Sequence, residues 1–140
     1  MKRHLLIPGL LIFSLITMSN TCNNTGDIVL KAGESAARKI ADVKYTIKVN
    51  SIEDNRCPKD VKCIRAGEAF VNVSVDRDND GEQLFRFCTG LDCRRGTVAD
   101  VNTISTATDN IEIKLLSVTP DPTLTNEKGS KKATFTIKKL

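Results

Sequence analysis

The stretch Ala69-Phe-Val-Asn-Val-Ser-Val75 places an aliphatic residue at every second position, and this period predicts a β-strand. Successive side chains of a strand point to opposite faces of its sheet, so the aliphatic residues would all share one face. These residues are Ala69, Val71, Val73 and Val75. One buried face of this kind is typical of a sheet that packs against a second layer.

The same period of two recurs in both directions along the chain. Apolar side chains alternate in residues 45–52, 111–118 and 133–140, and shorter strands are predicted at residues 27–31 and 83–88. The side chains expected on the buried faces of the three longer strands are Tyr45, Ile47, Val49, Ile111, Ile113, Leu115, Ala133, Phe135 and Ile137.

Many short strands without an internal repeat predict an all-β fold, an antiparallel β-sandwich of about seven short strands. Residues 76–81 are interpreted as a solvated hairpin turn, because the glutamate that an EF-hand calcium loop needs at its twelfth position is Phe87 here. Two segments, residues 35–40 and 98–103, are interpreted as short helical turns. A single domain over residues 27–140 would hold all of these elements.

The N-terminus has the pattern of an export signal. Lys2 and Arg3 precede a largely apolar run over residues 5–16, which is too short for a permanent transmembrane helix. Residues 1–21 are therefore expected to be a cleaved signal peptide, and the protein is expected to be exported to the cell envelope.

Cys22 follows this run at the place where bacterial lipoproteins carry their lipidated cysteine. It is the odd cysteine among five and a polar stretch follows it, so residues 22–26 are predicted to form a lipidated tether. Ser19 and Asn20 fit the usual lipidation signal poorly, and ordinary cleavage nearby is the alternative. More than one acyl chain on Cys22 would anchor the protein stably to a membrane, on its periplasmic or surface face.

Composition argues against several classes of function. The only histidine is His4, inside the expected signal peptide, so the exported chain would lack an imidazole for nucleophilic catalysis or for a histidine-bound metal. Without Lys2 and Arg3, 19 of the 21 basic residues remain against 17 acidic residues, a balance that does not favour nucleic acid. The chain is therefore expected to have no catalytic residue, no metal and no cofactor.

Four cysteines remain inside the expected domain. In an exported protein the default is two disulfides, and among three possible pairings the spacing favours the local pairs Cys57–Cys63 and Cys88–Cys93. A four-cysteine zinc site is the alternative, although zinc pairs usually have two to four residues between ligands, against five and four here. Each local disulfide would hold an exposed loop in one shape.

Charged residues near the first pair are expected to brace this loop rather than to catalyse a reaction. Asp54 and Arg56 lie two positions apart, and a local ion pair is favoured over an acid/base pair, because hydrolysis needs two carboxylates held across a substrate. The basic pairs at positions 94–95 and 131–132 are interpreted as solvated loop residues.

Residues 52–69, IEDNRCPKDVKCIRAGEA, resemble a motif of small exported lipoproteins of the Bacteroides group. That motif reads Glu-Asp-Ser-Arg-Cys-Pro, four residues, Cys, an aliphatic residue, then Trp-Ala-Gly, and such proteins are described as conserved proteins found in conjugative transposons. Asn55 and Arg65 stand here in place of the serine and the tryptophan. The resemblance implies a lipid-anchored β-sandwich, and it assigns no activity.

The expected function is a lipid-anchored, monomeric binding or interaction module of the cell envelope, whose ligand is an envelope protein, a conjugation component or a glycan. A rigid loop loses little entropy on contact, so the binding surface is predicted in the loop of residues 56–67. The candidate binding residues are Arg56, Pro58, Lys59, Lys62 and Arg65. The alternative is a protease inhibitor that presents the disulfide-closed loop, with Lys59 and Lys62 offered to a trypsin-like enzyme.

Overall fold

The structure, a computed structural model, describes residues 26–140 apart from positions 79, 96–99, 106–109 and 127–128. Within these residues the chain forms eight β-strands and one short 3-10 helix, so the all-β prediction is confirmed. The elements are β1 (Ile28–Lys31), β2 (Ser35–Ile40), β3 (Val43–Asp54), β4 (Ala69–Arg77), β5 (Glu82–Thr89), η1 (Asp92–Arg95), β6 (Val101–Ser105), β7 (Asn110–Thr119) and β8 (Lys132–Lys139).

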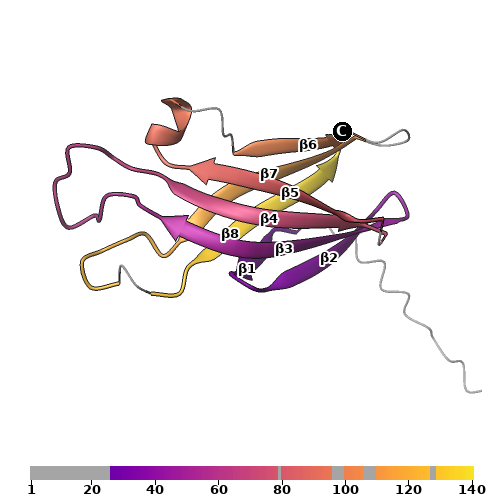
Figure 1. The fold of residues 1–140 in the computed structure, drawn as a ribbon, viewed down its shortest axis with the longest axis horizontal. Coiled ribbons are helices and arrows are strands. Elements are labelled where there is room, and N and C mark those ends of the chain that lie inside the picture. Colours follow the sequence, from indigo (N-terminus) through magenta and orange to yellow (C-terminus); the bar gives the residue numbers. More distant parts are fainter. Residues whose placement is uncertain (1–25, 79, 96–99, 106–109, 127–128) are drawn as a thin grey trace, which may run out of the picture.

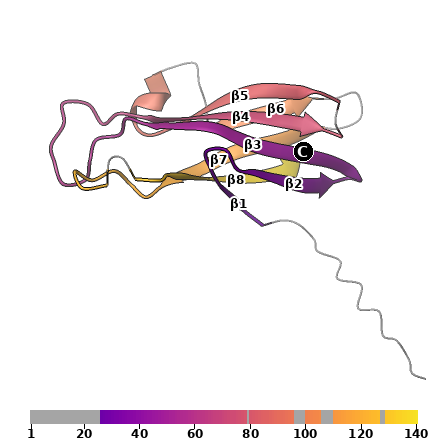
Figure 2. The ribbon, with the colours of Figure 1, turned by 60° about the horizontal axis from the view of Figure 1, so that its bottom comes forward.

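The strands form two four-stranded antiparallel sheets. One sheet has the order β1-β8-β7-β6 and the other has the order β2-β3-β4-β5. Figures 1 and 2 show the two sheets stacked as two layers, with β3, β4 and β5 over β7 and β8. The architecture is therefore the predicted antiparallel sandwich, and residues 76–81 lie at the predicted hairpin turn between β4 and β5.

The core lies between the sheets and consists of the aliphatic and aromatic residues that the alternation pointed to. All the residues expected on the inward faces of β3, β4, β7 and β8 are buried. Phe87 of β5 and Phe135 of β8 join the two sheets with an edge-to-face contact, their ring centroids 5.5 Å apart. All eight strands, both disulfides and this entire core lie within residues 28–139.

The predicted helical turn at residues 35–40 is wrong, because this segment is strand β2. It pairs with β3 along its whole length, from Ser35 opposite Lys48 to Ile40 opposite Val43. Ala41 and Asp42, between the two strands, both have positive φ angles, of 48° and 68°. Positive φ at both central residues is the requirement of the two-residue type I′ hairpin, which usually selects Asn-Gly or Asp-Gly. The sequence has Ala41-Asp42 at these two positions and therefore lacks the usual hairpin signal.

The second predicted helical turn, residues 98–103, is also wrong where the structure describes it. Residues 101–103 belong to strand β6, which pairs with β7 from Val101 opposite Lys114 to Ser105 opposite Asn110. Positions 98–99 lie outside the described residues.

The predictions for the N-terminus fall outside the part of the chain that the structure covers. The expected signal peptide, Cys22 and residues 22–25 of the expected tether are not among the described residues. Between residues 26 and 140, the described segments contain no helix that is long and apolar enough to cross a membrane.

Candidate functional site

Three loops meet at one end of the sandwich, which we call the loop end. They are residues 55–68 between β3 and β4, residues 90–95 after β5, and residues 120–126 and 129–131 between β7 and β8 (Figure 1). The stem of the first loop continues the β3–β4 ladder, because Asn55 N donates to Glu68 O at 2.9 Å and Cys57 N donates to Ala66 O at 2.8 Å. The loop is thus a rigid extension of the sheet and not a slack connection.

Both predicted disulfides are present. Cys57 pairs with Cys63 and Cys88 pairs with Cys93, with Cα atoms 6.0 Å and 5.8 Å apart. The four-cysteine zinc alternative is thereby ruled out, because no free thiolate remains in these four residues for a metal. Two disulfides in so small a domain indicate an oxidising, extracellular type of compartment.

Arg56 ties the first loop to the rest of the loop end. Its Nε and one terminal nitrogen donate to the two carboxylate oxygens of Asp54, both at 2.7 Å, so the predicted local ion pair is confirmed. The same side chain also donates to Asp121 Oδ1 at 2.8 Å and to the carbonyl oxygen of Val118 at 3.0 Å. A guanidinium with this many partners acts as a clamp between β3 and the β7–β8 loop.

Two lysines complete this network. Lys131 lies 3.4 Å from Asp54 Oδ2 and donates to Pro120 O at 3.1 Å. Only 7% of its side chain is exposed, so the interpretation of Lys131 as a solvated loop residue is wrong. A buried ammonium needs paired charge, and the Asp54 carboxylate supplies it. Lys59 forms an ion pair with Asp121 on the outer side of the network.

The charges of the network shift one another's pKa values. Burial alone would raise the pKa of Asp54, but the hydrogen bonds and positive charge of Arg56, with a contribution from Lys131, hold it below its usual range. The hydrogen bond to Asp54 raises the pKa of Arg56. Hydrogen bonding and charge from Lys59 and Arg56 lower the pKa of Asp121. Both carboxyl groups are therefore ionised at neutral pH.

The two disulfide loops contact each other through two glycines. Gly67 N donates to Asp92 Oδ2 at 2.8 Å, and Arg65 Nε lies 3.5 Å from the same oxygen. Gly67 and Gly90 have positive φ angles of 72° and 124°. A Cβ on Gly67 would lie 2.1 Å from the carbonyl oxygen of Asn55, and a Cβ on Gly90 would lie 2.8 Å from the carbonyl oxygen of Gly67. No larger residue fits between these backbones.

The predicted binding residues fall into two groups. Arg56 and Pro58 are partly buried, and Arg56 belongs to the supporting network. Lys59, Lys62 and Arg65 are exposed along the loop. These three side chains are thus accessible to a partner, whereas Arg56 sets the position of the loop that carries them.

Exposed aliphatic side chains at the loop end were not singled out by the sequence. Ile64 is fully exposed in the first loop, and Leu91 and Leu124 are more than 60% exposed on the other two loops. Val61, at 38%, is the least exposed of the four. Their position in predicted loops was the only indication in the sequence that these side chains are exposed. It was not sufficient, because an isolated aliphatic residue in a loop can equally well fill a core.

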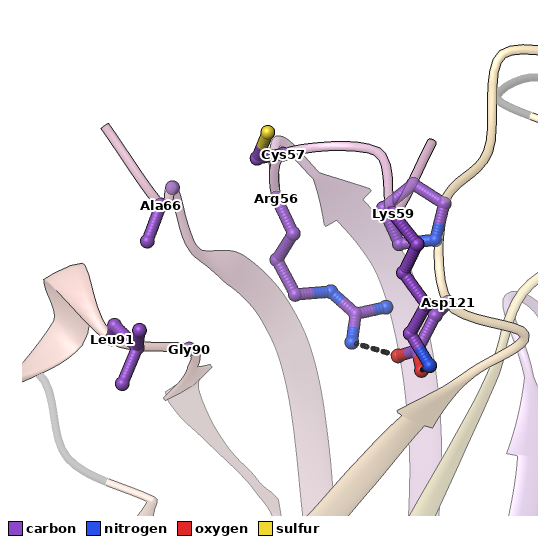
Figure 3. A pocket seen from close by; sticks show the side chains of 9 residues that line it. Arg56, Cys57, Lys59, Ala66, Gly90, Leu91 and Asp121 are labelled. Atoms are coloured by element: carbon purple, nitrogen blue, oxygen red, sulfur yellow. Dashed lines mark hydrogen bonds and ion pairs between the residues drawn. The ribbon is translucent and has the colours of Figure 1, made fainter. Parts of the chain in front are cut away.

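A cleft of about 190 Å³ separates the first loop from residues 90–91. Figure 3 shows Arg56 between Ala66 and Leu91 on one side and Lys59 and Asp121 on the other. A second, more polar cleft of about 400 Å³ is lined by the disulfide Cys57–Cys63 and by charged residues that include Arg65 and Asp92. In the described segments, no group of three or more His, Cys, Asp or Glu side chains is arranged to hold a metal ion.

Comparison of the chain with protein-family models, with curated proteins and with solved structures finds no match.

Proposed function

We propose that this protein is a lipid-anchored binding module of the cell envelope and that the loop end is its binding surface. One observation carries the proposal: the loop end is rigid, and it nevertheless exposes large aliphatic side chains, with Ile64 fully exposed directly after the disulfide-bonded Cys63. A stable fold gains nothing from this exposure, whereas a partner that covers it gains the free energy of apolar burial.

The contacts that hold the three loops of the loop end in place favour binding. Two disulfides, the clamp of Arg56 and the contact between Gly67 and Asp92 fix the three loops before any partner arrives. Fewer backbone and side-chain conformations are then lost on contact, which favours affinity. The carboxylates of Asp54 and Asp121 are engaged in ion pairs with Arg56 and Lys59 and are not held across a substrate, so we propose that the protein is not an enzyme.

The path of β1 is compatible with an anchor at Cys22. Ile28 pairs with Phe135 in the middle of β8, and Lys31 pairs with Lys132 beside the loop end. The chain therefore runs toward the loop end as it enters the sandwich at β1. An acylated Cys22 would anchor the N-terminal end of the domain to a membrane, in keeping with the lipoprotein motif that residues 52–69 resemble.

Binding of purified residues 23–140 to isolated cell envelopes of the source organism tests the proposed function. We expect saturable binding that is lost when Cys57 and Cys63 are both replaced by serine, with the β-sheet circular dichroism retained. The matched control is Leu84→Asp, which changes a side chain that is 76% exposed on β5, near the end of this strand that joins the β4–β5 hairpin. Equal binding by all three proteins would contradict the proposal.

Mass spectrometry on the protein extracted from its own envelope tests the anchor. We expect acyl groups on an N-terminal Cys22 and a gain of four protons on reduction, which corresponds to the two disulfides. An N-terminus elsewhere, without acyl mass, would mean a protein that diffuses freely.

A protease inhibitor is the second candidate, because Lys62 is exposed inside the disulfide-closed loop. The ion pair of Lys59 with Asp121 makes Lys62 the better residue for the specificity pocket of a trypsin-like enzyme. Inhibition of trypsin at micromolar concentration, and its loss in Lys62→Ala, would support this candidate. Absence of inhibition at that concentration would contradict it.

A further inference from the structure

We propose that the partner of the loop end is the surface of an anionic lipid bilayer; this inference rests on the proposed function and names the partner class. It is carried by the exposed aliphatic side chains of the three loops, together with the cationic side chains beside Ile64. Insertion of such side chains between lipid headgroups combines apolar burial with attraction between opposite charges.

The aliphatic side chains belong to loops that the structure holds side by side. Leu124 N donates to both carboxylate oxygens of Asp60, at 3.1 Å and 3.2 Å, and Lys59 N donates to Pro122 O at 3.0 Å. The first loop and the β7–β8 loop therefore touch near Val61. On the other side, Leu91 shares the smaller cleft with Ala66 and Cys57 of the first loop. The three loops thus form one surface.

The shape of this surface favours a bilayer over a protein. Ile64 is as exposed as an isolated residue. A strong protein–protein contact places such a side chain in a pocket and surrounds it with residues that exclude water. No neighbouring side chain in the described part of this protein covers Ile64, whereas lipid chains close around an exposed side chain from every direction.

The charges beside Ile64 select anionic headgroups. Lys62 and Arg65 flank Ile64 in the sequence, and both are exposed. Arg65 lies 3.5 Å from Asp92, but 72% of its side chain remains exposed, so its guanidinium still reaches solvent. In residues 58–66 the exposed charged side chains are Lys59, Asp60, Lys62 and Arg65. Lys59 is paired with Asp121, so Lys62 and Arg65 are the basic side chains that remain for a membrane. Each basic side chain near an anionic membrane adds to the attraction, and salt screens it.

The absence of tryptophan from the chain provides a direct test. Residues 23–140 carrying Ile64→Trp would be mixed with vesicles of phosphatidylglycerol and phosphatidylethanolamine, and with vesicles of phosphatidylcholine alone. We expect a blue shift of tryptophan emission with the anionic vesicles only. Leu84→Trp, on the β5 strand, is the matched control and is expected to show no shift.

Co-sedimentation with the anionic vesicles gives the second readout. We expect Ile64→Asp to weaken binding by roughly tenfold to a hundredfold, the loss that corresponds to burial of one aliphatic side chain. Lys62→Glu should weaken binding at low salt, with little effect at high salt. Ile64 is exposed, so these variants are expected to fold as the unchanged protein does.

The outcomes separate this inference from the proposed function. No shift from Ile64→Trp, or equal sedimentation of Ile64→Asp and the unchanged protein, would overturn the lipid inference. If envelope binding nevertheless persisted and still required the Cys57–Cys63 disulfide, the partner would be a protein or a glycan, and the proposed function would stand. If envelope binding also failed, both proposals would be wrong.

Discussion

Arg56 shows how one side chain can set the shape of a loop. Only 16% of it is exposed, and it joins Asp54 of β3, the carbonyl oxygen of Val118 in β7 and Asp121 after β7. The carboxylate of Asp54 is 4% exposed, so its charge depends on this guanidinium and on Lys131. Removing a partner from such a pair leaves a buried charge without compensation and strongly lowers the free energy of unfolding.

Arg56→Lys should therefore destabilise the protein although it keeps the charge. Lysine cannot reproduce the two-pronged contact with Asp54 or reach three segments at once. We expect a loss of about 2 kcal/mol in the free energy of unfolding, measured by urea denaturation. Arg86→Lys is the control: Arg86 is half exposed over the ring of Phe70, and the expected loss is below about 1 kcal/mol. Equal losses in the two variants would contradict the clamp.

The lowered pKa values of Asp54 and Asp121 predict how stability depends on pH. A carboxyl group with a lowered pKa in the folded state stabilises the protein fully above its unfolded pKa, near 4, and loses that contribution as pH falls through the folded pKa. We expect stability to decline below about pH 4. In Asp54→Asn this acid decline should be shallower, as measured by denaturation at several pH values. An unchanged slope would mean that Asp54 does not contribute.

Sequence distance decided which of these residues could be predicted. Asp54 and Arg56 are two positions apart, and local spacing was enough to predict their ion pair. Asp121 is 65 positions from Arg56, and only the fold brings the two together. Lys131 was misinterpreted for the same reason, because nothing in its neighbourhood in the sequence indicates a buried carboxylate.

At the level of elements, the four central strands with one fully buried face were predictable, whereas edge strand β2 and part of edge strand β6 were mistaken for helical turns. The other two edge strands, β1 and β5, were predicted at residues 27–31 and 83–88. The alternation of β3, β4, β7 and β8 reflects burial between the sheets. β2 lies at an edge, its burial is only partial, and its sequence SAARKI is rich in residues with high helix propensity. Pairing with β3 overrides that propensity, as tertiary context commonly does.

Gly67→Ala tests the close packing within the stem of the first loop. Its Cβ would clash with the backbone of Asn55, in addition to the strain of a positive φ. Gly33→Ala is the matched control, because Gly33 has a φ of 86° but open space around its Cβ position. We expect the control to lose about 1 kcal/mol and Gly67→Ala to lose clearly more, by thermal or urea denaturation. Similar losses would indicate that the stem does not pack closely around Gly67.

At the scale of the whole molecule, the sandwich and the loop end are separable in stability. The core is complete between the sheets, with Phe87 and Phe135 in contact across it, and the Cys57–Cys63 pair lies outside it. Loss of that disulfide should therefore alter the loop end and spare the core.

The double replacement Cys57→Ser and Cys63→Ser should lower the free energy of unfolding by about 2 kcal/mol, because the closed loop is short. Unfolding should remain a single cooperative transition with an unchanged β-sheet spectrum. Phe135→Ala, at the centre of the core, should instead cost about 3–5 kcal/mol. A double variant that is unfolded in buffer would show that the disulfide supports the fold itself and not one loop.

The most direct measurement is photo-crosslinking in the living envelope of the source organism. A photoreactive amino acid would replace Lys62 in the loop end and, in a separate strain, Leu84 on the β5 strand; both positions are exposed. The account predicts a specific adduct from position 62, its loss when Cys57 and Cys63 are replaced by serine, and no adduct from position 84. Adducts from position 84 alone, or from position 62 regardless of the disulfide, would contradict the claim that the rigid loop end is the binding surface.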